Sequence, residues 1–206
     1  NLTKEKIENQ YLRALVFQLY EKNGVIKRSE IDNIIKLIPS DERKKLWGMG
    51  IKLGRYHVYL PKMLKPKAVE FRVSLWKIFY NFTEKHPIPK FGLNFIVDKD
   101  YTKDFLLLCG FEKFREYFVR IDILEKLFIK ILDSSKDRKF KINAEMMNLL
   151  GCTKENFGKL MNYMDYKKDK AADTYIFRGD KRKINKLNKF DKKENPFKKL
   201  MTLNIK

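Results

Sequence analysis

The side chains with the greatest chemical reactivity are few and scattered in this sequence. His57 and His86 are the two histidines, Cys109 and Cys152 the two cysteines, and none of the four has a second ligand at metal-binding spacing. No Gly-x-x-x-x-Gly-Lys-Ser/Thr loop, Gly-x-Gly-x-x-Gly fingerprint or Gly-x-Ser-x-Gly elbow is present. A Cys-His nucleophile pair stays open, although apolar, turn-flanking surroundings favour structural thiols. The sequence therefore predicts no catalytic residue, metal or cofactor within this chain.

Paired carboxylates could act as acid and base, but their positions favour a structural role. Asp122 and Glu125 follow Arg120 at the expected start of a helix. A carboxylate there stabilises the helix N-terminus, and the neighbouring guanidinium offers an ion pair. We therefore expect a structural ion pair rather than proton transfer.

Basic residues interleaved with aromatics are the stronger signal, above all in "GRYHVYLPKMLKP", residues 54–66. Strand alternation would place Arg55, His57 and Tyr59 on one face and the apolar alternates in the core. Arginine and tyrosine offer flat faces and hydrogen-bond donors, which suit base stacking and phosphate contact. The alternatives are an ordinary amphipathic strand with solvated charges, and a histidine that bonds a backbone carbonyl.

The charge points to anionic partners. There are 46 basic and 26 acidic residues, so the formal net charge is +20. Such an excess favours nucleic acid before membrane, although a lysine-rich chain can also reflect genomic base composition. No run of about 18 apolar residues is present, so we expect no membrane span. Two cysteines make no disulfide framework, which favours a reducing, cytoplasmic compartment.

The elements of the first half are predicted by their apolar periodicity. We expect a helix over 3–22, a second helix capped by Ser29, a third over 41–50, and a β-hairpin near 51–60. The longest helix is expected over 61–82. Together these form a helical module over residues 1–98. The apolar stripe expected to face the core of this module comprises Leu64, Ala68, Phe71, Leu75, Phe79 and Phe82.

Residues 99–178 have the order helix, strand, helix, strand, two short helices and hairpin, which is typical of a winged-helix-like module. Asn143 and Thr153 are expected to cap the two short helices. Residues 179–206 are a predicted basic tail. The fold class expected for the whole chain is therefore mainly α with short β-hairpins.

Several blocks resemble the C-terminal half of large helicase-like proteins of alphaproteobacteria. The second block is "CGF…VRIDILEKL", the third "MMNLLGCTKENFGKLMNYMDY" and the last "NPFKKLMTL". Phe111, Ile121 and Asp165 depart from the family pattern. The first block is carried by Gly50, Gly54, Arg55, Tyr59, Leu60, Pro61, Leu64, Lys65, Pro66, Arg72, Leu75 and Trp76.

That family is similar to the mitochondrial degradosome RNA helicase, a DExH enzyme of helicase superfamily 2. The resemblance implies ATP-dependent unwinding of RNA or DNA. It also implies that the motor domains, with their ATP and Mg²⁺, lie outside this chain, so we expect the sequence to belong to a longer protein. The chain itself would be a nucleic-acid-binding accessory region that grips single-stranded or tailed RNA or DNA.

The alternatives to a helicase accessory region are a protein-docking module of an RNA-processing complex and a stand-alone winged-helix DNA-binding protein.

Two sets of nucleic-acid contact residues follow from the leading expectation. One set comprises Arg55, Tyr59, Lys62, Lys65 and Arg72, and the other comprises Lys154, Asn156, Lys159, Lys167 and Lys168.

Overall fold

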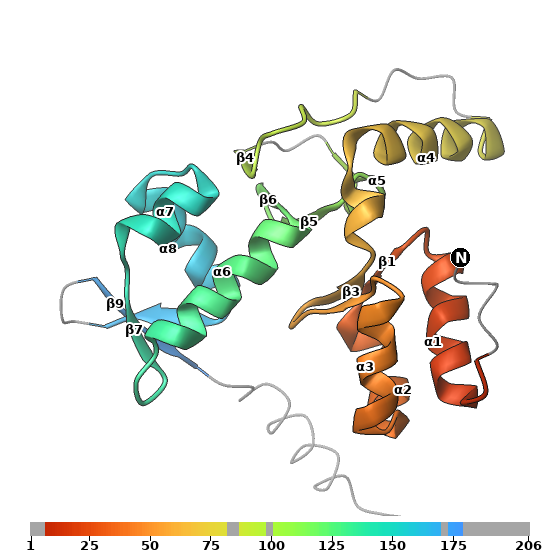
Figure 1. Ribbon diagram of the computed structural model, residues 1–206. Helices are drawn as coiled ribbons and strands as arrows, with labels where there is room; N and C mark the ends of the chain where they lie inside the picture. The colour runs from red at the N-terminus through yellow and green to blue at the C-terminus, as the bar shows by residue number, and fades with distance from the viewer. Residues whose placement is uncertain (1–6, 82–86, 98–100, 170–172, 179–206) are drawn as a thin grey trace, which may run out of the picture.

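The computed structural model describes residues 7–81, 87–97, 101–169 and 173–178 (Figure 1). Within these ranges the chain is mainly helical, with short antiparallel strands gathered in three-stranded sheets. The expected class, mainly α with short hairpins, is confirmed at that level. The basic tail predicted for 179–206 lies outside the described residues.

The first unit is built around a sheet in the strand order β1-β3-β2. Asn9 begins the first helix, because its Oδ1 accepts hydrogen bonds from the amides of Tyr11 and Leu12. Gly24 follows that helix at φ +83°, a left-handed conformation that favours glycine. The elements of the unit are α1 (Gln10–Glu21), β1 (Val25–Lys27), α2 (Arg28–Leu37), α3 (Ser40–Gly48), β2 (Lys52–Leu53) and β3 (His57–Tyr59).

The middle unit has a sheet in the order β4-β6-β5. Two of its strands, β4 and β5, were not expected from the sequence. The boundary expected after residue 98 passes between β4 and its partner β6, so it divides one sheet. The elements are η1 (Pro61–Leu64), α4 (Pro66–Phe79), β4 (Phe95–Val97), α5 (Lys103–Leu108), β5 (Phe111–Phe114) and β6 (Tyr117–Arg120).

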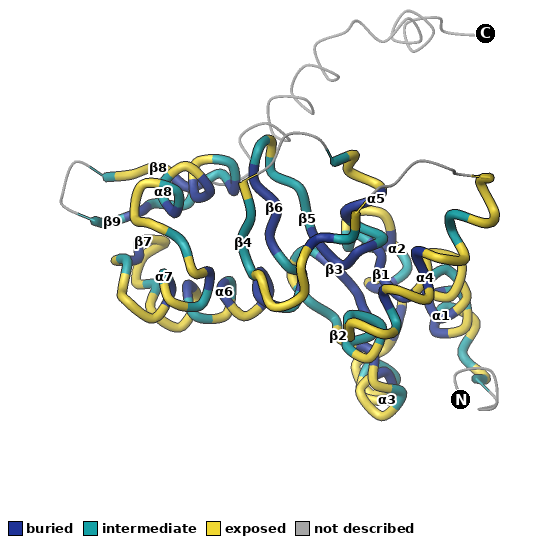
Figure 2. Tube along the Cα trace, turned by 90° about the horizontal axis from the view of Figure 1, so that it is seen from above, coloured by how far each residue is buried: buried dark blue, intermediate teal, exposed yellow. Residues whose placement is uncertain are grey.

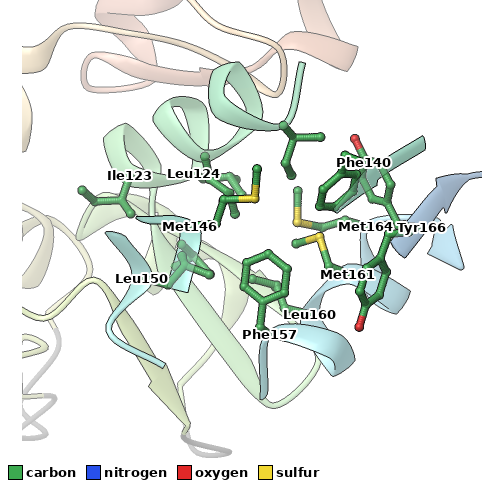
Figure 3. Close-up of a cluster of buried hydrophobic side chains, with 14 residues drawn as sticks. Ile123, Leu124, Phe140, Met146, Leu150, Phe157, Leu160, Met161, Met164 and Tyr166 are labelled. Atoms are coloured by element: carbon green, nitrogen blue, oxygen red, sulfur yellow. The ribbon is translucent and has the colours of Figure 1, made fainter. Parts of the chain in front are cut away.

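The third unit repeats the element order of the first, with a sheet in the order β7-β9-β8. The predicted caps are confirmed: Asn143 Oδ1 accepts the amide of Met146, and Thr153 Oγ1 accepts that of Asn156. Its core gathers methionine, leucine and phenylalanine side chains between the helices and the sheet (Figure 3). The elements are α6 (Ile121–Ser134), β7 (Lys139–Lys141), α7 (Ala144–Leu150), α8 (Lys154–Tyr163), β8 (Tyr166–Lys168) and β9 (Thr174–Phe177).

Three expectations for the helices are wrong. The helix expected over 3–22 begins at Gln10, and the described residues 7–9 before it are not helical. The second helix begins at Arg28, one residue before the predicted cap Ser29, and no side chain caps it. The helix expected from Pro61 begins at Pro66, because the preceding turn is a 3₁₀-helix.

Much of the apolar stripe that was expected to face the core is exposed. Leu64, just before α4, and Ala68 are half-buried, and Phe82 lies outside the described residues. Phe71, Leu75 and Phe79 are 66%, 51% and 78% exposed, whereas Val69 and Val73 are buried. The apolar spacing is real, but the neighbouring elements pack against the other side of the helix.

A buried carboxylate joins the first and third units. Glu125, in α6, is 6% exposed and accepts the amides of Arg55, Tyr56 and His57 at 2.5, 2.8 and 2.9 Å. A Cβ at Gly54 would overlap this carboxylate, so glycine is required by close approach. The segment before β3 is therefore fixed against α6.

A second carboxylate joins the first and middle units. Glu112, in β5, contacts His57 Nε2 through Oε2 at 2.9 Å and Lys27 Nζ through Oε1 at 2.7 Å. Figure 2 shows β1, β3 and β6 as largely buried segments in the middle of the molecule. The three units therefore meet around β3.

We expect Gly54→Ala to lower the free energy of unfolding by about 1–3 kcal/mol, the usual cost of overpacking. Urea unfolding followed by circular dichroism measures the change. Gly48→Ala is the matched control, because a Cβ there meets nothing within 4 Å, and helix propensity predicts a gain of up to about 1 kcal/mol. Equal midpoints for Gly54→Ala and the wild type would contradict this packing.

Candidate functional site

The strand expected to present a basic, aromatic face to solvent is buried on both sides. His57 is 1% exposed and Tyr59 8% exposed, so the prediction that they share an open face is wrong. The reason is that the middle and third units cover the side of β3 that a single unit would leave free. Arg55, which precedes the strand, is exposed, and Tyr56 is half-buried.

Arg72 is also removed from the predicted contact set. It is 4% exposed, and its Nη1 donates to the carbonyl of Asn23 at 2.6 Å. Burial lowers the pKa of its guanidinium. Arg72 therefore joins α4 to the turn after α1, while Lys62 and Lys65 lie exposed between β3 and α4.

The outer face of α8 packs against the β5–β6 hairpin. The Tyr163 hydroxyl donates to Glu116 at 3.0 Å, and the Tyr117 hydroxyl donates to Asn156 Oδ1 at 3.4 Å. The guanidinium of Arg115 lies 4.9 Å from the centroid of the Tyr163 ring. The polar side chains expected to reach phosphates or bases from this helix are thus partly occupied within the molecule.

The lysines of the second contact set divide into two kinds. Lys154 pairs with Asp173 at 2.6 Å, and Lys159 pairs with Glu155 at 2.7 Å. Lys167 and Lys168 lie exposed on β8. Among the described residues, none of the five residues of this second set lines a cavity together with the residues of the first set.

Two neighbouring cavities lie between the first and third units, and together we call them the α6 groove. It consists of a cavity of about 730 Å³ and a smaller one of about 400 Å³, which share Arg55, Phe128 and Leu132. The larger is also lined by Tyr56, Ile131, Ser135, Arg138, Met164, Asp165, Tyr166 and Phe177, and the smaller by Arg28, Trp47, Lys52, Leu53, Gly54, Tyr59, Glu125 and Ile129.

Cations lie over aromatic rings along this groove. Lys52 Nζ is 5.5 Å from the centroid of the Trp47 ring, and the Arg55 guanidinium is 5.7 Å from that of Phe128. Trp47 is 71% exposed. Flat rings with cations beside them offer stacking surfaces and phosphate contacts within one surface.

The balance of charge in the groove is basic. Four basic residues and two acidic ones line it. The buried carboxylate of Glu125 is satisfied by three backbone amides, and Arg28 Nη1 donates to the carbonyl of Gly54 at 2.7 Å. Lys52, Arg55 and Arg138 therefore present exposed cationic side chains to a ligand.

Sequence reasoning identified only part of this groove. Of the ten predicted contact residues, Arg55 and Tyr59 line it. Phe128 and Arg138 were missed, because α6 was interpreted as a central helix and the turn after it carries no pattern. An exposed tryptophan close to a lysine, as in Trp47 and Lys52, was the one local signal available.

His57 is an internal ion-pair partner rather than a contact for a ligand. Burial lowers its pKa, but the hydrogen bond to Glu112 and the nearby Glu125 outweigh burial, so the pKa of His57 is raised. The pKa of Glu112 is lowered, because His57 and Lys27 outweigh the effect of its own burial. Both shifts favour the charged pair.

The cysteines are free, and burial raises the pKa of Cys109 to about 12 and that of Cys152 to about 11. Neither thiol is therefore a thiolate at neutral pH.

The described residues contain no cluster of three or more potential metal ligands. In the described part of the chain, no helix has both the length and the apolar character needed to cross a membrane.

Compared with known proteins, the chain matches no family model, no curated protein and no solved structure. What the groove can bind must therefore be inferred from its own residues.

We expect His57→Gln to cost more stability at pH 5.5 than at pH 9. Because the pKa of His57 is raised on folding, its contribution is complete below the unfolded value of about 6.5 and is lost as pH rises through the folded value. Glutamine does not titrate, so it serves as the constant reference. Urea unfolding at the two pH values measures the difference. An equal cost at both would show that the His57–Glu112 ion pair does not contribute.

Proposed function

We propose that this chain is a nucleic-acid-binding accessory region, built of winged-helix-like units, of an ATP-dependent helicase. Its motor domains, with ATP and Mg²⁺, would lie outside this chain, and the protein would act in the cytoplasm on single-stranded or tailed RNA or DNA. The helicase assignment is supported by the resemblance of the ordered sequence blocks. The binding assignment is supported by the α6 groove.

The observation that carries the proposal is the combination of charge and flat rings in that groove. Lys52, Arg55 and Arg138 are exposed beside Trp47 and Phe128. Proteins that bind single strands without sequence preference combine a basic track with aromatic stacking platforms. A duplex hides its base faces in the stack, so only an unpaired strand could use both features.

The winged-helix-like assignment is supported by topology. In the first and third units the order is helix, strand, two helices and two strands, and the first strand pairs with the last. The middle unit has the same sheet order with one helix fewer among the described residues. The β5–β6 hairpin covers part of α8, which disfavours a stand-alone regulator that reads DNA with that helix.

A protein-docking role is the second candidate, favoured by one observation. The exposed side of α4 carries Phe71, Leu75, Ile78 and Phe79 at helical spacing. A continuous apolar stripe of this kind marks a surface for another protein. This face lies outside the α6 groove, so both roles can coexist.

We expect Arg55→Ala to weaken binding of a single strand and to reduce the slope of log affinity against log salt by about one, the value for one lost phosphate contact. Fluorescence polarisation with labelled oligo-U and oligo-dT over a range of salt concentrations measures both. The backbone amide of Arg55 is kept, so its bond to Glu125 is preserved.

Arg13→Ala is the matched control, since Arg13 is an exposed arginine on α1 and does not line the groove. It should leave affinity within about twofold, as for a charge remote from the site. Salt-insensitive binding by the wild type, or equal losses in the two variants, would overturn the groove as the binding site.

A further inference from the structure

We propose that the larger cavity of the α6 groove holds one unstacked nucleobase of a single strand, with the arginines at its edge on the adjoining phosphates. This inference rests on the proposed function and assigns a place within it. The cavity has about 730 Å³, within the range of sites that enclose small organic groups. A basic surface alone would predict backbone contact only.

The cavity is apolar at depth and carries the exposed Arg55 and Arg138, while the half-buried Asp165 is the acidic residue of its lining. Met164 and Tyr166 are buried, Tyr56 and Phe128 half-buried, and Arg55 exposed. A nucleobase has an apolar, polarisable face and is attached to a charged backbone, so it requires this order of environments. A free phosphate would gain nothing from the aromatic walls.

The aromatic walls are arranged as edge-on or tilted pairs. Tyr56 and Phe128 have centroids 5.6 Å apart at 82°, and Tyr166 and Phe177 have centroids 5.2 Å apart at 54°. In an edge-on pair, the ring that contributes its edge keeps its faces for other contacts. A planar base can therefore stack in the cavity without separating a parallel pair.

The two arginines come from different units and are fixed by backbone contacts. Arg55 is positioned by the bond from its amide to Glu125, and the carbonyl of Arg138 accepts the amide of Phe177 at 3.1 Å. Arg138 has φ +62°, the left-handed conformation of a tight turn. Two guanidinium groups that line an aromatic cavity can bind the phosphates that adjoin an inserted base.

The test compares two strands of equal charge on the full chain: twelve residues of oligo-dT, and a twelve-residue strand of tetrahydrofuran abasic sites. Fluorescence polarisation gives both affinities at the same salt concentration. We expect the wild type to bind oligo-dT about tenfold more tightly, because one stacked base contributes on this scale. Equal affinities would overturn the base pocket and leave a purely electrostatic groove.

Two variants locate the effect. Leu132→Trp fills the groove from a 55% exposed position that both cavities share, and Phe177→Leu removes a ring face that lines only the larger cavity but keeps an apolar side chain. Each should lower the preference for oligo-dT and leave abasic binding unchanged, and any preference that remains is the contribution of stacking on Trp47. Leu37→Trp, also at a 55% exposed leucine but on α2, should keep the tenfold preference.

The outcomes separate the two proposals. If both strands bind with steep salt dependence but without preference, the pocket and stacking on Trp47 are excluded, and the proposed nucleic-acid binding keeps its electrostatic support. If neither strand binds, the proposed function fails and the pocket fails with it. If the Leu132→Trp and Phe177→Leu variants keep the full preference, the base lies elsewhere and this cavity is excluded. Melting temperatures confirm that each variant is folded.

Discussion

The buried carboxylate of Glu125 is the contact on which the arrangement of this molecule depends. It lies in the first two turns of α6, in the third unit, and accepts three successive amides before and within β3, in the first unit. Hydrogen bonds from amides to a charged acceptor are stronger than those to a neutral one. Removal of the carboxylate would also leave three backbone donors unsatisfied and partly buried. Gly54 makes the close approach possible.

The groove follows from this contact. The hydrogen bonds from these amides to Glu125 fix the backbone of Arg55 and Tyr56 opposite α6. Their side chains therefore face Phe128 across a space that neither unit encloses alone. The side chain of His57, in β3, contacts Glu112 of the middle unit and so links that unit to the same strand. The buried charged groups therefore hold the units together, and the exposed cations around the groove are available to a ligand.

Local signals in the sequence predicted local structure well. Asn143 and Thr153 cap their helices as expected, because a side chain and amides within three residues decide a cap. Arg120 and Asp122 form the expected ion pair, with 2.6 Å between Nε and Oδ1. The hairpin near 51–60 is present as the antiparallel strands β2 and β3, because alternation of side chains within a few residues is also a local signal.

Features that depend on packing between units could not be predicted. The stripe through Phe71 and Leu75 has perfect helical spacing, but spacing cannot say which side of α4 another unit covers. Tyr59 alternates as a surface residue would, yet it packs beside Ile121 of the third unit. Arg55 and Arg138 line one cavity although they are far apart in the chain, and no periodicity connects them.

Hydrogen exchange at three amides tests the central contact most directly. If Glu125 fixes the segment, the amides of Arg55, Tyr56 and His57 should be protected as strongly as the core of α6 in the wild type. In Glu125→Ala that protection should fall at least about a hundredfold, since three backbone donors would lose their acceptor at about 1–3 kcal/mol each, while the amides within α1 should be affected less. Rapid exchange of these three amides in the wild type would contradict the account.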